Sequence, residues 1–534
     1  MKRALNQSLY EPSCRSGLKG INAVLRRESR PGTLKGIKGR SYRRLTTILL
    51  SVLPALVVSG CAMLGPDYQQ PDVPVESDWL DSGDVRVTRE QPVDPKWWRS
   101  AFQDPVLDQL IETALQQNLT LRSAGLRVLQ SQQQLAIAIG NQFPQQQQAT
   151  GSAVKQRENA STFEEYSLGL NLSWEVDFWG RFRRQVESAS AELDASIADY
   201  DGALVSLVSQ VAQNYLLIRT SQARLQVTRN NIKLQEESLR VSKAKFDAGE
   251  VSELDADQAE SLLNNTRATV PALETSLQQF KNSLAILLGK PPHDLNYLLG
   301  ELRPIPSTPA EIALGMPQDL IRQRPDIRAA ERRLAAQSEQ IGVAETELYP
   351  AFSIGGSIGT TALDTDDLFN NDSKTWNLFG AFQWNILNYG RLKSNVRLQD
   401  ALFQQLLVDY QDTVLQAQGD VENSIVAYIK SHEQLEAYRL AAAASKRSVD
   451  VSTAQYQNGL VDFNTVISTL DADAQQQDLL ASTQGTVVTN LVQVYRALGG
   501  GWEIRANRDP VELLPTDLKD EMRERTGAWK GVLQ

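Results

Sequence analysis

A seven-residue repeat of apolar side chains, running for about 67 residues and occurring twice, limits what this chain can fold into. In residues 181–247 the repeat positions are Ile197, Leu204, Val211, Ile218, Leu225, Ile232, Leu239 and Phe246. In the second occurrence they are Leu407, Val414, Val421, Tyr428, Leu435, Ala442, Val449 and Tyr456. A sustained seven-residue period predicts a coiled-coil seam. A helix of this length spans about 100 Å, which is more than the width of an ordinary domain.

The two long helices belong to a unit that is duplicated at an offset of 210 residues. The stretch "WEVDFWGR" at 174–181 corresponds to "WNILNYGR" at 384–391, and the same offset aligns Gly249 with Gly459 and Gly289 with Gly499. One offset held over such a distance indicates an internal repeat. Each copy is expected to contain strand, strand, long helix, turn and shorter return helix. The return helices are predicted at 252–288 and 462–498, and further helices at 104–141 and 317–348 precede the strands.

Alternating apolar and polar residues predict four β-strands, two in each copy. The pattern is clearest in "YSLGLNLSWEVDFWGR" (166–181), and its partners are predicted near 146–157, 352–359 and 375–388. The hairpin loops would fall near 158–164 and 362–374. Aromatic residues gather on one strand face, as in a membrane-interface belt: Tyr166, Trp174, Trp376, Phe382 and Trp384. A coiled-coil rod with a small protected sheet, outside any membrane, is the alternative.

Strands with an apolar outer face can span a bilayer only as a closed barrel, because lipid offers no partner to the backbone groups of an open edge. Four strands are too few to close. Three chains with twelve strands are a natural solution, and two chains would give a narrow barrel. The expected fold class is therefore mostly α with a membrane β-barrel, in which the long coiled-coil helices form a trimeric α-barrel joined to a 12-stranded β-barrel.

The first sixty residues differ in charge from the rest of the chain. Residues 1–60 carry twelve Lys and Arg against two Glu, which leaves 42 basic and 62 acidic residues, a net charge of −20, in residues 61–534. An acidic body argues against a nucleic-acid partner. Arg43 and Arg44 precede the apolar run "LTTILLSVLPALVVSG", which has the length of a signal-peptide core.

The apolar run ends at "VSGC", which resembles the lipobox at which bacterial lipoproteins are cleaved and lipidated, and thus predicts Cys61 as the lipid attachment site. Ala62 after the cysteine implies sorting to the outer membrane. An ordinary secretory signal with an incidental cysteine is the alternative.

The sequence lacks the usual marks of catalysis. Its two histidines, His293 and His432, are far apart, and no nucleophile beside a histidine, zinc motif or phosphate loop is present. We therefore expect no enzyme activity, no cofactor and no metal site.

Three stretches resemble signatures of a known family: "PKWWRSAFQDPVLDQLIETALQQNLTLRSA", "RQRPDIRAAERRLAAQSEQIGVAETELYPAFSI" and "RALGGGW". They are similar to the outer membrane factor family of TolC-like channels, in its NodT-type lipoprotein branch, and the match runs from Cys61 to about Trp502. The resemblance implies a homotrimer that is lipid-anchored in the outer membrane of a Gram-negative bacterium and extends into the periplasm. It would be the exit duct of a tripartite pump, passively conducting drugs or other small molecules from a periplasmic adaptor and an inner membrane transporter of RND type.

The resemblance also places functional residues at the two helical hairpin tips. Those expected to dock the adaptor are Gly249, Val251, Asp255, Gly459, Val461 and Asp462. The family's constriction leucine and acidic residue fall on Asn464 and Ser468, which predicts a less hydrophobic and less charged constriction. Asp462 and Asp471 are candidates for a ring of charge, or they are ordinary solvated helix acids.

These inferences divide the chain into six segments: leader 1–60, lipidated extended segment 61–103, first repeat 104–289, equatorial linker 290–316, second repeat 317–499 and equatorial tail 500–534. Two other functions remain open from the sequence. The chain could be the outer membrane channel of a type I protein secretion system, or a periplasm-spanning structural lipoprotein that conducts nothing.

Overall fold

The computed structural model describes residues 63–81, 83–88, 94–158, 161–292, 295–309, 311–315 and 323–533. The chain divides into two units, Met1–Gly60 and Cys61–Gln534, and only the second contains described residues. The predicted leader and Cys61 lie outside the described residues. Within the described ranges, no helix is long and apolar enough to cross a membrane.

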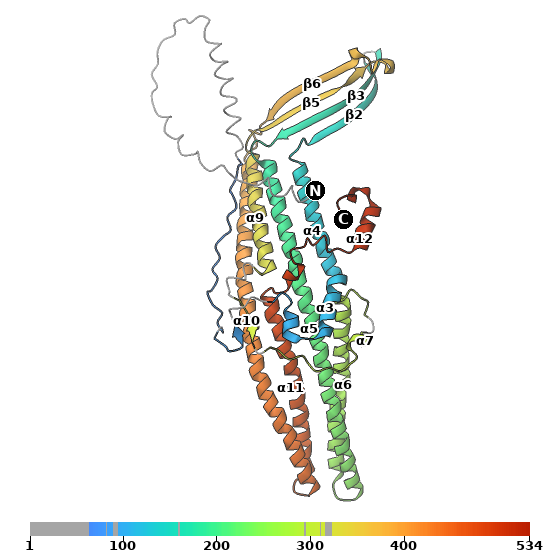
Figure 1. Cartoon of the computed structure of the whole chain (residues 1–534), viewed down its shortest axis with the longest axis vertical. Coiled ribbons are helices and arrows are strands. Elements are labelled where there is room, and N and C mark those ends of the chain that lie inside the picture. The colour runs from blue at the N-terminus through green and yellow to red at the C-terminus, as the bar shows by residue number, and fades with distance from the viewer. Residues whose placement is uncertain are drawn as a thin grey trace, which may run out of the picture. The chain divides into compact units, whose positions relative to one another are not determined.

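Two helices of 67 residues each form the frame of the second unit: α5 (Arg181–Asp247) and α10 (Arg391–Gln457). Their return partners are α6 (Glu253–Leu287) and α11 (Phe463–Ala497), with 35 residues each. Both pairs are displaced by 210 residues, so the predicted long helices and their duplication are confirmed. Figure 1 shows α6 and α11 running back beside the ends of α5 and α10 that lie away from the strands.

Shorter helices flank the long ones at the strand end: α3 (Pro105–Gln117) and α4 (Leu119–Gly140) in the first copy and α9 (Pro325–Thr346) in the second. The single helix predicted over 104–141 is wrong, because the chain breaks at Asn118. The Asn118 side chain accepts a hydrogen bond from the Leu121 backbone N–H (2.8 Å) and donates one to the Leu287 carbonyl (2.9 Å). One residue thus caps the start of α4 and the end of α6 where the two helices meet.

The four strands form one antiparallel sheet in the order β2-β3-β5-β6, as predicted in number and pairing: β2 (Gln146–Glu158), β3 (Ser161–Val176), β5 (Ala351–Ala362) and β6 (Lys374–Gln383). Several bounds differ from the prediction, among them the end of β3, which lies at Val176 and not near Arg181. The first hairpin pairs as far as Glu158 with Ser161, so the loop predicted at 158–164 is much shorter. β6 ends at Gln383, five residues early, because Asn385 to Gly390 turn into α10.

The core lies along the coiled-coil seam and around the N-terminal segment. Leu204, Val211 and Ile218 are buried in one cluster with Trp97, which stacks on Tyr495 with ring centroids 4.8 Å apart. The segment before the first repeat is therefore packed into the helical body. The remaining described elements are small: β1 (Val87–Thr88), α2 (Trp97–Phe102), α7 (Asn296–Leu299), β4 (Ile312–Ala313) and α12 (Thr516–Arg525).

Candidate functional site

One face of the sheet carries the predicted aromatic residues. The register pairs Tyr166 with Ala362, Trp174 with Ile354 and Trp376 with Ile358, and directly paired residues point to the same face. Phe382, paired with Phe352, shares that face. The face is apolar and open: Trp376 is 78% and Leu378 77% exposed. Trp384 lies one residue beyond β6, and its indole N–H donates to the Leu348 carbonyl (2.9 Å).

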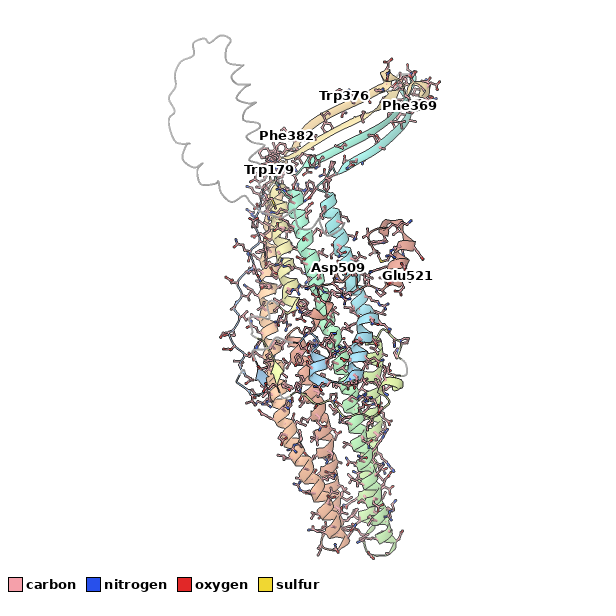
Figure 2. The ribbon with its side chains drawn as sticks, in the orientation of Figure 1. Trp179, Phe369, Trp376, Phe382, Asp509 and Glu521 are labelled. Carbon is pink, nitrogen blue, oxygen red and sulfur yellow. The ribbon has the colours of Figure 1, made fainter. Side chains whose placement is uncertain are left out.

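Exposed aromatic residues lie at both ends of the sheet. Figure 2 shows Phe369 at the hairpin-loop end and Phe382 at the end that meets the helices. Both side chains are exposed. Aromatic residues at the two ends of an apolar strand face are typical of the two interfaces of a bilayer.

The opposite sheet face is polar and hydrogen-bonded across the strands. Asn171 donates to the Thr150 hydroxyl (3.0 Å), and the hydroxyls of Ser152 and Ser167 lie 2.8 Å apart. A sheet with one apolar and one polar face suits lipid on one side and water on the other. The polar face offers hydroxyl and amide groups that can hydrogen-bond to water and to a passing solute.

The junction between sheet and helices holds the segment that follows Cys61. Residues 63–67, which we call the N-terminal strap, lie across the start of α5 and the end of α9. Leu64 donates its backbone N–H to the Trp179 carbonyl (3.1 Å), and a Cβ on Gly342 would come within 2.8 Å of the Leu64 oxygen. Only glycine lets α9 approach the strap this closely.

Arg184 of α5 holds the strap by its charge. Its guanidinium donates to the carbonyls of Leu64 (3.1 Å) and Gly65 (3.3 Å) and to the Asp67 carboxylate (3.0 Å). The same buried guanidinium donates to Glu339 (2.6 Å). Burial and the hydrogen bond to Glu339 raise the pKa of the neighbouring Glu187 to about 7. The strap is thus fixed by one buried arginine that lies beside the carboxyl groups of Glu187 and Glu339.

Both hairpin tips have the same backbone geometry. Gly249 has φ = 74° and Gly459 φ = 70°. Glu250 donates its backbone N–H to the Lys245 carbonyl and Leu460 to the Gln455 carbonyl, each at 2.9 Å. This is the six-to-one hydrogen bond of a Schellman cap, which needs a left-handed residue at the glycine position.

The predicted tip residues have different surroundings. Asp462 caps α11, since its carboxylate accepts from the backbone N–H (3.0 Å) and hydroxyl (2.8 Å) of Thr465, and these bonds lower the pKa of Asp462. Asp255 lies 3.4 Å from the Ser252 hydroxyl at the start of α6. Val461 packs against the cluster that joins the two tips, while Val251 is half-buried in its own turn.

The candidate constriction residues lie together on one exposed face of α11. Asn464, Ser468 and Asp471 are spaced by four and three residues, which places them on one helix face. The Ser468 hydroxyl donates to the Asn464 carbonyl (2.8 Å), and Asp471 accepts from Gln475 (3.0 Å). Around a symmetric opening this face would supply amides, hydroxyls and one carboxylate from each chain.

Two features of the site have no counterpart among the sequence predictions. One is the Arg184 strap contact. The other is a link between the tips, in which the Lys245 ammonium lies 4.5 Å from the Tyr456 ring centroid, next to buried Phe463. The repeat offset could have drawn attention to both, because Arg184 and Lys245 correspond to Ser394 and Gln455 in the second copy.

Among the described residues, no group of three His, Cys, Asp or Glu side chains is placed to hold a metal ion. His432 lies edge-on to Tyr428 with ring centroids 4.7 Å apart, and burial lowers its pKa. His293 lies outside the described residues.

The model of the family described as "Outer membrane efflux protein" matches residues 110–290 and 316–500. "Nodulation protein T" of Rhizobium leguminosarum bv. viciae is 31% identical over 458 residues, covering 85% of this chain and 93% of that protein. The "Probable outer membrane lipoprotein SilC" of Salmonella typhimurium is 28% identical over 463 residues, covering 85% and 98%. The solved outer-membrane channel OprN superposes with a TM-score of 0.78 at 30% identity, covering 82% of this chain and 99% of that one.

Proposed function

The chain belongs to the outer membrane efflux protein family, and from this we propose that three copies form the exit duct of a tripartite pump for small molecules. It is an outer membrane efflux channel of a Gram-negative bacterium and extends into the periplasm. The observation that carries the proposal is the open sheet, whose apolar face is exposed and whose edge strands are β2 and β6. One chain leaves both edges unpaired, and closure with further copies satisfies them.

Conduction follows from the arrangement of the two faces. With the apolar face toward lipid, the polar face that contains Ser167 and Asn171 lines the interior. The long helices continue this interior into the periplasm. The duct performs no chemistry and supplies no energy, so transport is driven by the inner membrane partner.

The periplasmic adaptor docks at the two hairpin tips in this proposal. The tips at Gly249 and Gly459 share their cap geometry, so one chain presents two similar docking elements and a trimer presents six. Val251, Asp255, Val461 and Asp462 surround them. Asn464, Ser468 and Asp471 line the constriction, and the transporter beyond the adaptor is of RND type.

The lipid anchor at Cys61 is part of the proposal. Its support is the strap, which begins two residues later and is fixed to the junction between sheet and helices by Leu64 and Arg184. An acyl chain on Cys61 would therefore be held near the membrane end of the helices.

A deletion strain tests the proposed cargo. We expect greater susceptibility to small toxic compounds, restored by the wild-type gene, with the pattern of secreted proteins unchanged. Unchanged susceptibility together with loss of one secreted protein would overturn small-molecule efflux in favour of type I secretion.

A further inference from the structure

The two copies of the junction motif differ in how their basic residues are neutralised. In the first copy Arg181 pairs with Glu175 (3.1 Å) and Arg183 with Asp177 (3.1 Å). The equivalent basic residues of the second copy are Arg391 and Lys393. The equivalents of the two acids are Asn385 and Leu387, so both carboxylates are missing.

The basic residues at the start of α10 are consequently exposed and without an ion pair. Arg391, Lys393 and Arg397 are exposed, and none of them has a carboxylate within 4 Å among the described residues. Arg391 lines a 310 Å³ cavity together with Glu175, Asp177 and Glu347, although it forms no ion pair with them. Lys393 and Arg397 lie one helical turn apart on α10, and neither of them lines this cavity.

Exposed apolar side chains adjoin these cations. Between the end of β6 and the start of α10, Leu387 is 84% exposed and Tyr389 fully exposed, and Trp384 and Ile386 are also open. They continue the apolar sheet face toward the helices. A surface with aromatic and aliphatic residues on one side and free Lys and Arg on the other matches the boundary between acyl chains and phosphate groups.

The α4 helix and the adjoining part of β2 of a neighbouring copy do not supply the missing negative charge. The sheet edges are β2 and β6, so closure of the trimer places β6 and the start of α10 beside β2 and the end of α4 of the next copy. Residues 119–157, which comprise α4 and nearly all of β2, contain no Asp or Glu. These two elements of the next copy therefore offer no carboxylate to the cations.

We propose that Lys393 and Arg397, with Arg391, bind the phosphate of an anionic phospholipid in the periplasmic leaflet, whose acyl chains lie against Trp384, Leu387 and Tyr389. The proposal rests on the outer membrane placement of the sheet and does not depend on which compounds the duct carries. Each Lys or Arg near a membrane surface favours anionic lipid about five-fold, so the pair contributes on the order of twenty-fold.

The test measures the lipids retained by the purified trimer. Wild-type trimer in a neutral detergent is mixed with equal amounts of phosphatidylglycerol and phosphatidylcholine, and native mass spectrometry counts the bound lipids. We expect a preference for phosphatidylglycerol that weakens with salt. The variant Lys393→Gln/Arg397→Gln should lose most of it, while Lys446→Gln/Arg447→Gln, which removes one exposed lysine and one exposed arginine far along the same helix, should keep it.

A second variant restores the charges of the first copy. Asn385→Glu/Leu387→Asp should recreate the ion pairs of residues 175–183 and abolish the phosphatidylglycerol preference without removing a cation. Equal retention of the two lipids by the wild type, or an unchanged preference in both junction variants, would overturn the proposal. Dissociation of the junction variants into monomers with the lipid preference intact would show that the cations serve subunit contact instead.

Discussion

Replacing the tip glycines tests whether tip geometry couples this duct to its pump. Gly249 and Gly459 have left-handed φ values of 74° and 70°, and a Cβ built on either one meets nothing within 4 Å. The cost of Gly459→Val is therefore backbone strain alone, about 2 kcal/mol for a β-branched residue in this conformation. The chain can relieve that strain by giving up the hydrogen bond from Leu460 to the Gln455 carbonyl, which reshapes the tip.

Such a loss is too small and too local to unfold the distant sheet. We expect Gly249→Val and Gly459→Val to form wild-type amounts of trimer and to lose efflux, measured as compound susceptibility in a deletion strain. Gly419→Val is the matched control, because Gly419 lies inside α10, its Cβ also meets nothing within 4 Å, and valine there changes stability by less than about 1 kcal/mol. Full resistance in both tip variants at wild-type trimer abundance would refute the reasoning.

Three further predictions concern other parts of the chain. Gly485→Val should destabilise the trimer by about 1–3 kcal/mol or more, because a Cβ at this position would lie 2.3 Å from the Thr220 hydroxyl between α11 and α5. The loss should be seen as a lower melting temperature, and an unchanged melting temperature would contradict this packing. Because the pKa of Glu187 is raised to about 7 from 4.5, the folded state binds a proton more readily than the unfolded chain, and its stability should fall as pH rises from about 4.5 to 7. Glu187→Gln should flatten that fall in a melting series across pH, and an equally steep fall would place the titration elsewhere. Cys61→Ser should abolish labelling by radioactive palmitate, whereas retained labelling would exclude Cys61 as the lipidated residue.

The elements that occur in both copies of the repeat could be predicted from the sequence, whereas features present in only one copy were missed. The bounds of α5 and α10 follow from the seven-residue period, and the strands from strict alternation, because both signals extend over many residues. The break at Asn118 was missed, although its side chain caps α4 locally at Leu121; the same side chain also contacts the Leu287 carbonyl, 169 residues away. A local pattern can suggest the cap, but it does not report the contact with the end of α6.

The candidate site shows the same division. The aromatic face could be predicted because side-chain parity in a strand is local, and the register then joined Tyr166 and Trp376 across three strands. The surroundings of Arg184 could not be predicted from the sequence, because they are formed by three separate segments: the strap, α5 and α9. For Asp462 the sequence left two roles open, and its hydrogen bonds to Thr465 favour a structural one as the cap of α11.

The conductance of the purified protein in a planar lipid bilayer tests the central claim most directly. A duct formed by three chains should have the mass of a trimer in mild detergent and give a steady ionic conductance that needs no energy source. A stable monomer with its full β content, or a trimer that inserts and conducts no ions, would contradict the account and support a structural lipoprotein instead.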